Sequence, residues 1–162
     1  MRSSANRYAV RMANIRDETI SMTLEDRQAI VDATIRYCWA IDTRAYGELH
    51  EIFTEDVYCD YAGRAPTTGV GPLTDLIAAV LDRLDRSQHM LSNHQIEISP
   101  DGPRSRCYFH AQHVREDAEG GPNYIVAGIY TDLWRKTPDG WRSCRRTLEV
   151  LWTEGNLAVV AP

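Results

Sequence analysis

A carboxylate suited to acid–base chemistry follows an apolar helical pattern early in the chain. The residues that recur at i, i+4, i+7 and i+11 on one helical face are Ile30, Thr34, Tyr37 and Ile41. Tyr37 puts a phenol on this face, and Asp42 stands at the helix exit. Because the C-terminal end of a helix carries partial negative charge, an ionised aspartate there is disfavoured unless it is solvated, caps the next helix or meets a partner. Either Asp42 or Thr43 caps a helix that begins near Ala45, or Asp42 points into a pocket and orients a base.

Histidines further along the chain supply other candidates for acid–base chemistry. His89 and Asn93 share one face of a predicted strand, 88–99, whereas His110 belongs to a polar and aromatic row that faces either a pocket or solvent. His113 falls on the opposite face from His110, so the two rings cannot both bind one metal from a regular strand. The sequence contains no GxSxG, no P-loop and no GxGxxG followed by a helix. These residues indicate acid–base work by Asp, His and Tyr, with no metal and no evident cofactor.

One charged residue interrupts the apolar face of the last predicted strand, 141–153. The residues on that face are Cys144, Arg146, Leu148, Val150 and Trp152. A guanidinium buried in this row would require a carboxylate or an anionic ligand. The alternative is a bulge in the strand that turns Arg146 to solvent.

Helical segments precede the sheet. Thr23 to Phe53 is predicted to form a long amphipathic helix, a corner and a shorter helix, and Thr23 with Asp26 forms a weak capping box. Residues 57–61, VYCDY, are rich in aromatic and branched side chains and predict a short strand. After a turn-rich loop, Pro72 starts another helix. Its apolar stripe, typical of core packing, consists of Leu73, Leu76, Ile77, Val80, Leu81 and Leu84.

The period of the apolar residues changes to two from Gln88 onward. The predicted strands span 88–99, 104–116, 123–135 and 141–153, and short PDG, EGGP and TPDG turns separate them. Such turns require antiparallel neighbours, because parallel strands need long crossovers. Helices followed by a curved sheet give an α+β fold, and a sheet wrapped around helices encloses a cone-shaped cavity lined by alternate residues of each strand.

Composition limits the class of protein. The 162 residues suit one domain, and a formal net charge of −5 argues against nucleic acid as the main partner. The 4 cysteines are far apart and form no CxxC pair, which favours reduced thiols in a cytoplasmic protein. Residues 1–22 contain arginines but no continuous apolar segment, so neither a signal peptide nor a membrane span is predicted. We interpret this segment as an N-terminal arm.

The order and separation of four short motifs resemble the SnoaL-like branch of the nuclear transport factor 2-like superfamily. The motifs are YCWAID at the end of the long helix, VYCDY, QHMLSN and GWRSCRR. The resemblance covers a domain at 23–153, between the arm and a C-terminal tail at 154–162. It implies a cone-shaped α+β barrel in which three helices pack in a strongly curved, mainly antiparallel sheet.

The resemblance also implies a catalytic set. Scytalone dehydratase, bile-acid dehydratase and hexachlorocyclohexane dehydrochlorinase use an Asp near the end of the first helix with a His at the start of the third strand, and these positions match Asp42 and His89. Tyr37 matches a tyrosine of the bile-acid enzyme, and Tyr61 matches one of scytalone dehydratase. His110 falls near the position of a second histidine of scytalone dehydratase.

Three further residues, Arg146, Asn93 and Tyr58, are predicted to contact the substrate, and Arg146 matches an arginine of the dehydrochlorinase. We predict a cofactor-independent dehydratase in which Asp42 orients His89 to deprotonate a hydrophobic cyclic or polyketide-like small molecule. The alternatives are an isomerase or cyclase with the same base, or a non-catalytic small-molecule-binding module. A homo-oligomer is expected because one face of an open sheet needs cover, and the resemblance favours a trimer over a dimer.

Overall fold

The computed structural model describes residues 22–161, so the predicted arm lies outside the described residues apart from Met22. In chain order the elements are α2 (Leu24–Asp42), η1 (Tyr46–Glu48), α3 (Leu49–Ile52), β1 (Phe53–Tyr61), β2 (Thr67–Thr68), α4 (Val70–Leu81), β3 (Arg86–Ser99), β4 (Gly102–Val114), β5 (Asn123–Thr137), β6 (Gly140–Gly155) and η2 (Leu157–Val159). No helix in this range is both long and apolar enough to cross a membrane.

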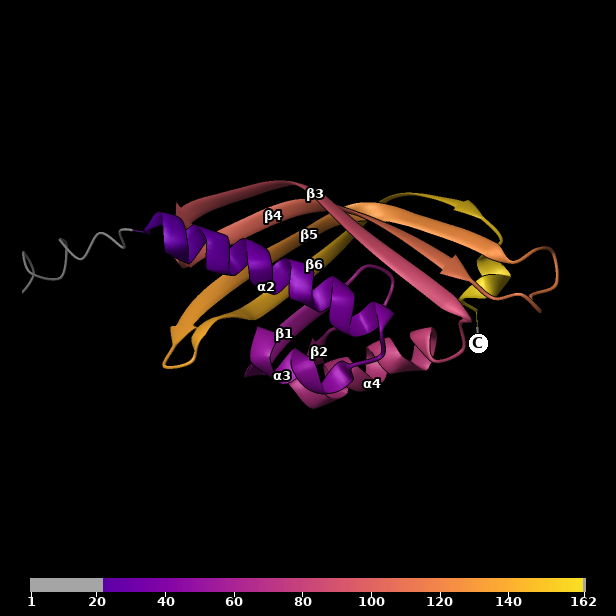
Figure 1. The fold of residues 1–162 in the computed structure, drawn as a ribbon, viewed down its shortest axis with the longest axis horizontal. Helices are drawn as coiled ribbons and strands as arrows, with labels where there is room; N and C mark the ends of the chain where they lie inside the picture. Colours follow the sequence, from indigo (N-terminus) through magenta and orange to yellow (C-terminus); the bar gives the residue numbers. More distant parts are fainter. Residues whose placement is uncertain (1–21, 162) are drawn as a thin grey trace, which may run out of the picture.

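One six-stranded sheet runs in the order β2-β1-β6-β5-β4-β3. Strands β3 to β6 form the antiparallel meander that their short turns predicted. Strand β1 instead pairs in parallel with β6, across the long connection that contains α4. The sheet curves over α2, while α3 and α4 lie next to β1 and β2 (Figure 1). The predicted α+β fold, with helices packed in a curved and mainly antiparallel sheet, is confirmed.

Helix α2 begins at the predicted capping box. The Thr23 hydroxyl accepts a hydrogen bond from the Asp26 backbone N–H at 3.1 Å, and the Asp26 carboxylate accepts one from the Thr23 backbone N–H at 3.2 Å. Asp26 also binds Lys136 and the indole N–H of Trp141, at 2.9 and 2.8 Å. The cap therefore joins the start of the helix to the hairpin between β5 and β6.

Several boundaries differ from the predicted ones. Strand β1 begins at Phe53, which the pattern assigned to the preceding helix, because Phe53 pairs with Ser143 of β6. Helix α4 begins at Val70 rather than at Pro72, and Gly69 precedes it with a φ of 98° that favours glycine. Pro72 still lies in the first turn, where its missing N–H has no intrahelical partner to lose.

Two β-bulges interrupt the pairing of β5 with β6. The register shifts between Leu133 and Trp134 and again between Ala127 and Gly128. At the second bulge the two backbones approach so closely that a Cβ atom on Gly128 would lie 2.0 Å from the carbonyl oxygen of Glu149. Only glycine fits this contact.

The bulges correct the predicted face of the last strand. Its inward side chains are Ser143, Arg146, Leu148, Val150 and Thr153. Strict alternation placed Cys144 and Trp152 on this face, but each bulge shifts the alternation by one residue, and Trp152 is 48% exposed. Arg146 nevertheless stays inside, so the alternative in which a bulge turns it to solvent is wrong.

A buried ion pair connects the centres of β5 and β6. Arg146 donates from Nε and Nη2 to the two carboxylate oxygens of Asp132, at 2.8 and 2.9 Å, and the side chains are 0% and 1% exposed. The Ser143 hydroxyl donates to the same carboxylate at 2.7 Å. The Arg146 guanidinium also lies 4.2 to 5.0 Å from the ring centroids of Tyr37, Tyr130 and Phe53. The cluster therefore joins side chains of α2 and β1 to the central strands β5 and β6.

Breaking this pair is expected to destabilise the fold strongly. The variant Asp132→Asn leaves a buried cation without its counter-charge, so the free energy of unfolding should fall by about 3–5 kcal/mol. Urea denaturation of the purified variant measures this loss. As a matched control, Asp56→Asn removes one carboxylate from the exposed pair with Arg135 and should change the unfolding midpoint little. Equal effects of the two variants would contradict this interpretation.

Candidate active site

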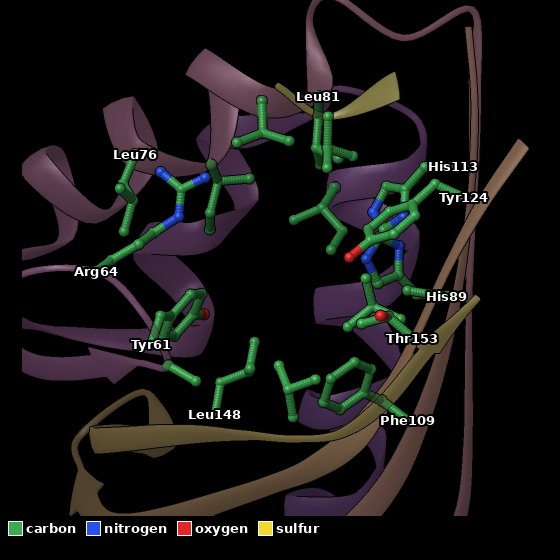
Figure 2. Close-up of a pocket in the computed structure, with 18 of the residues that line it drawn as sticks. Tyr61, Arg64, Leu76, Leu81, His89, Phe109, His113, Tyr124, Leu148 and Thr153 are labelled. Atoms are coloured by element: carbon green, nitrogen blue, oxygen red, sulfur yellow. The ribbon is translucent and has the colours of Figure 1, made fainter. Parts of the chain in front are cut away.

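A cavity of about 330 Å³ lies between the inner face of the sheet and helices α2 and α4 (Figure 2). Most of its wall is aliphatic or aromatic. The lining residues with a polar or charged side-chain group are Tyr37, Tyr61, Arg64, His89, His113, Tyr124, Tyr130 and Thr153. Leu157 and Val160 complete the wall, so part of the predicted C-terminal tail closes the cavity. A pocket of this size and composition suits a small hydrophobic molecule.

Asp42 and His89 meet at the edge of this cavity, as predicted. The carboxylate Oδ1 lies 2.7 Å from Nδ1 of the imidazole, and Oδ2 accepts the His89 backbone N–H at 2.7 Å. The His89 ring lines the cavity, and Asp42 lies behind it. An ionised carboxylate only accepts hydrogen bonds, so this geometry assigns the proton to Nδ1 and makes Nε2 the basic atom of the ring.

The capping interpretation of Asp42 is wrong. The next helical turn, η1, follows Ala45 without a side-chain cap, and the Thr43 hydroxyl donates back to the carbonyl of Trp39. The Asp42 carboxylate is instead occupied by His89 and by the Ser87 hydroxyl, which donates to Oδ1 at 2.8 Å. The carboxylate therefore orients a histidine.

Arg44 offsets the negative end of α2 beside this carboxylate. Its backbone turns the corner after the helix with a φ of 62°. Its guanidinium donates to the carbonyls of Ile41 and Leu81 and to the Ser87 hydroxyl, at 2.8, 2.7 and 2.9 Å. Burial alone would raise the pKa of Asp42, but the hydrogen bonds and charge of His89 and the Ser87 hydroxyl lower it, so Asp42 stays ionised. Arg44 and Ser87 were not predicted from sequence, because their role depends on α2, α4 and β3 meeting.

Two predicted phenols form a pair across the cavity from the histidine. The hydroxyl oxygens of Tyr37 and Tyr61 lie 3.1 Å apart. Figure 2 shows Tyr61 on the opposite side of the cavity from His89. Burial raises the pKa of both phenols, so both stay protonated at neutral pH and can donate. The cavity thus has an imidazole on one wall and protonated phenols on the other.

A second histidine lines the cavity, but it is His113 and not His110. The His113 ring packs edge-on against His89, with the centroids 5.7 Å apart. His110 lies on the other face of β4, where it packs against Trp152 with centroids 5.7 Å apart. The prediction of His110 in the site is therefore corrected. The apolar row Cys107, Phe109 and Ala111 has the same parity as His113 and was the sequence signal that marked the inward face.

None of the three predicted substrate contacts lines the cavity. Tyr58 lies on the opposite face of β1 from Tyr61. Its ring packs against the Arg145 guanidinium, whose carbon lies 4.8 Å from the ring centroid. Asn93 lies at a β-bulge with a φ of 56°, beside a separate depression on the outer face of the sheet. Arg146 is occupied by Asp132. These placements are corrected because strand alternation and a bulge direct Tyr58 and Asn93 away from the cavity, and because Asp132 already binds the inward Arg146.

In residues 22–161, no group of three or more His, Cys, Asp or Glu side chains is placed to hold a metal ion. The polar groups that do line the cavity include imidazoles and phenols, which are side chains able to transfer protons.

A curved sheet closed by helices around an apolar cavity is the architecture of the nuclear transport factor 2-like superfamily. Within it, the chain belongs to the SnoaL-like domain family, which matches residues 22–147. It is 33% identical over 130 residues to an uncharacterized protein of Mycobacterium tuberculosis, covering 78% of this chain and 84% of that protein. It is 27% identical over 147 residues to terrestric acid biosynthesis cluster protein E of Penicillium crustosum, covering 87% and 93% of the two chains. A solved structure of a putative scytalone dehydratase from Novosphingobium aromaticivorans is 26% identical with a TM-score of 0.73, covering 82% and 89% of the two chains.

The buried His113 is expected to make stability depend on pH. Burial, and then the charge of His89, lower the pKa of His113 to about 4. Below its ordinary pKa the unfolded chain takes up a proton that the folded ring does not, so the free energy of unfolding falls as pH decreases. Between pH 6.5 and 4.5 this contribution is about 2 kcal/mol.

Urea denaturation over this pH range measures the effect. The variant His113→Gln should lose this part of the pH dependence, whereas His110→Gln, on the outer face, should keep it. Parallel stability curves for wild type and His113→Gln would contradict the assignment.

Proposed function

We propose that the protein is a cofactor-independent lyase, a dehydratase, that acts on a hydrophobic cyclic or polyketide-like small molecule. The observation that carries this proposal is the 2.7 Å contact between Asp42 and the His89 ring in the wall of an apolar cavity. A histidine held in this way is a general base, and the surrounding wall favours an apolar substrate.

The base removes a proton from a carbon next to an electron-withdrawing group. Asp42 keeps the proton on Nδ1, so Nε2 of His89 accepts the substrate proton, and the resulting imidazolium is stabilised by the carboxylate. The electron pair of the broken C–H bond forms the new double bond. A general base of this kind contributes about 10²–10⁴-fold in rate.

The phenols on the opposite wall supply the acid. Tyr61, hydrogen-bonded to Tyr37, donates its proton to the departing hydroxyl, so that the C–O bond breaks and water leaves. The proton held by His89 then returns to Tyr61 through solvent, which restores both groups. His113 stays neutral beside His89 and adds a polar contact without a second charge.

The comparisons support this proposal at a coarser level. Membership of the SnoaL-like family and the similarity to a putative scytalone dehydratase agree with dehydratase chemistry. The name of the Penicillium relative places that protein in a biosynthetic cluster for terrestric acid, which supports a role in secondary metabolism.

Screening hydroxylated cyclic ketones for water loss tests the proposal. With a substrate that yields a product lighter by one water, His89→Gln and Asp42→Asn should each lower kcat/KM by about 10²–10⁴-fold while the fold is retained. His110→Gln should keep the wild-type rate, because that ring lies outside the cavity. A product of unchanged mass would assign an isomerase or cyclase instead. Wild-type turnover by His89→Gln would refute the base.

We also propose that the chain forms a homo-oligomer through the outer face of the sheet, with a trimer favoured over a dimer. Tyr124, Val126 and Tyr130 of β5 line the cavity, so the alternate side chains Ile125, Ile129 and Leu133 face outward. They lie beside Tyr108 and Trp152, which are 47% and 48% exposed. Exposed apolar side chains that adjoin one another mark interaction surfaces. Light scattering should give a multiple of the single-chain mass that Trp152→Glu reduces, and the mass of one chain for wild type would contradict self-association.

A further inference from the structure

Arg64 brings a permanent positive charge to the cavity. It lies in the loop that follows β1, and its backbone N–H donates to the carbonyl of Tyr61 at 3.0 Å. Among the described residues that line the cavity, no other side chain carries a permanent charge. Figure 2 shows Arg64 on the side of Tyr61, across the cavity from His89 and His113. The cavity therefore has a cationic side and an imidazole side, with apolar walls between them.

No described residue supplies a counter-charge to the Arg64 guanidinium. Elsewhere around the site the arginines are occupied: Arg44 bonds to carbonyls and to Ser87, and Arg146 is paired with Asp132. Within residues 22–161, by contrast, the Arg64 side chain takes part in no ion pair and no hydrogen bond. Arg64 is exposed to solvent and at the same time lines an otherwise apolar cavity, so its guanidinium donors are accessible to a ligand that enters there.

We propose that the substrate is a hydrophobic monoanion whose carboxylate is bound by Arg64 and whose apolar body fills the cavity. A planar guanidinium matches a carboxylate with two parallel hydrogen bonds. A dianionic phosphate fits less well, because a single cation serves this cavity and the protein has a net charge of −5. The substrate class is thus an aromatic or alicyclic carboxylic acid.

The contact between Arg64 and the substrate carboxylate, called the carboxylate anchor below, also sets the orientation of the substrate in the cavity. A carboxylate held at Arg64 directs the far end of the molecule toward His89 and His113 (Figure 2). This orientation rests on the proposed function, because His89 is the base only in that mechanism. The binding of an acid at Arg64 does not rest on it.

A matched pair of probes tests the anchor without requiring turnover. The probes are 2-naphthoate, which is an anion at neutral pH, and 2-naphthamide, which is its neutral analogue of nearly the same shape. Calorimetric titration at low salt should show 2-naphthoate binding about three- to tenfold more tightly to the wild-type protein. The preference should disappear in Arg64→Gln and persist in part in Arg64→Lys, which keeps the charge but not the fork of donors.

The variant Arg106→Gln is the control, since it removes the same charge from the outer face of the sheet, beside a separate depression. It should keep the preference for the acid. Equal affinities for the two probes in the wild type, a preference that survives in Arg64→Gln, or failure of both probes to bind would each overturn the inference.

The two proposals can fail separately. If Arg64 selects the acid but no substrate loses water, the anchor stands and the dehydratase mechanism falls. If a neutral substrate loses water in a reaction that depends on His89 and is unaffected by Arg64→Gln, the mechanism stands and the carboxylate anchor falls.

Discussion

The buried pair between Arg146 and Asp132 is the constraint around which the concave side of the sheet is built. Removing one partner of a buried ion pair leaves an uncompensated charge in the interior, and here the pair joins directly opposed residues of β5 and β6. The guanidinium also packs against the rings of Tyr37 and Tyr130, which form part of the cavity wall. The ion pair thus supports the floor of the site, and its charges are not exposed to a ligand.

Above this floor, the polar groups of the cavity come from elements that are distant in sequence. Strand β3 contributes the imidazole of His89, β4 a second histidine and β1 a phenol, while the end of α2 places a carboxylate behind His89. Arg44 and Ser87 join these elements where an ionised Asp42 would otherwise meet the negative end of a helix. An apolar wall then separates the imidazoles from the guanidinium of Arg64.

Much of this arrangement was accessible from sequence because it depends on local periodicity. The helical stripe, the capping box at Thr23 and the antiparallel meander all appear as predicted. The Asp42–His89 pair was predicted by family resemblance, since helical and strand periods do not report which distant residues meet. His110 was placed in the site in error, because the family resemblance was followed there and not the apolar row of Cys107, Phe109 and Ala111 on the opposite face of the strand.

The sequence by itself determined the order and type of the elements and the presence of a carboxylate, imidazoles and phenols able to transfer protons. Hydrogen bonding along the backbone and the burial of apolar stripes are local enough to be encoded in short segments. Only the tertiary structure decided that His113 packs against His89 in the cavity, that Thr153 replaces Trp152 on its wall and that Arg146 is paired inside the protein. These outcomes depend on the pairing of β3 with β4, on two bulges and on a carboxylate from the neighbouring strand, and such contacts form only when the chain is folded.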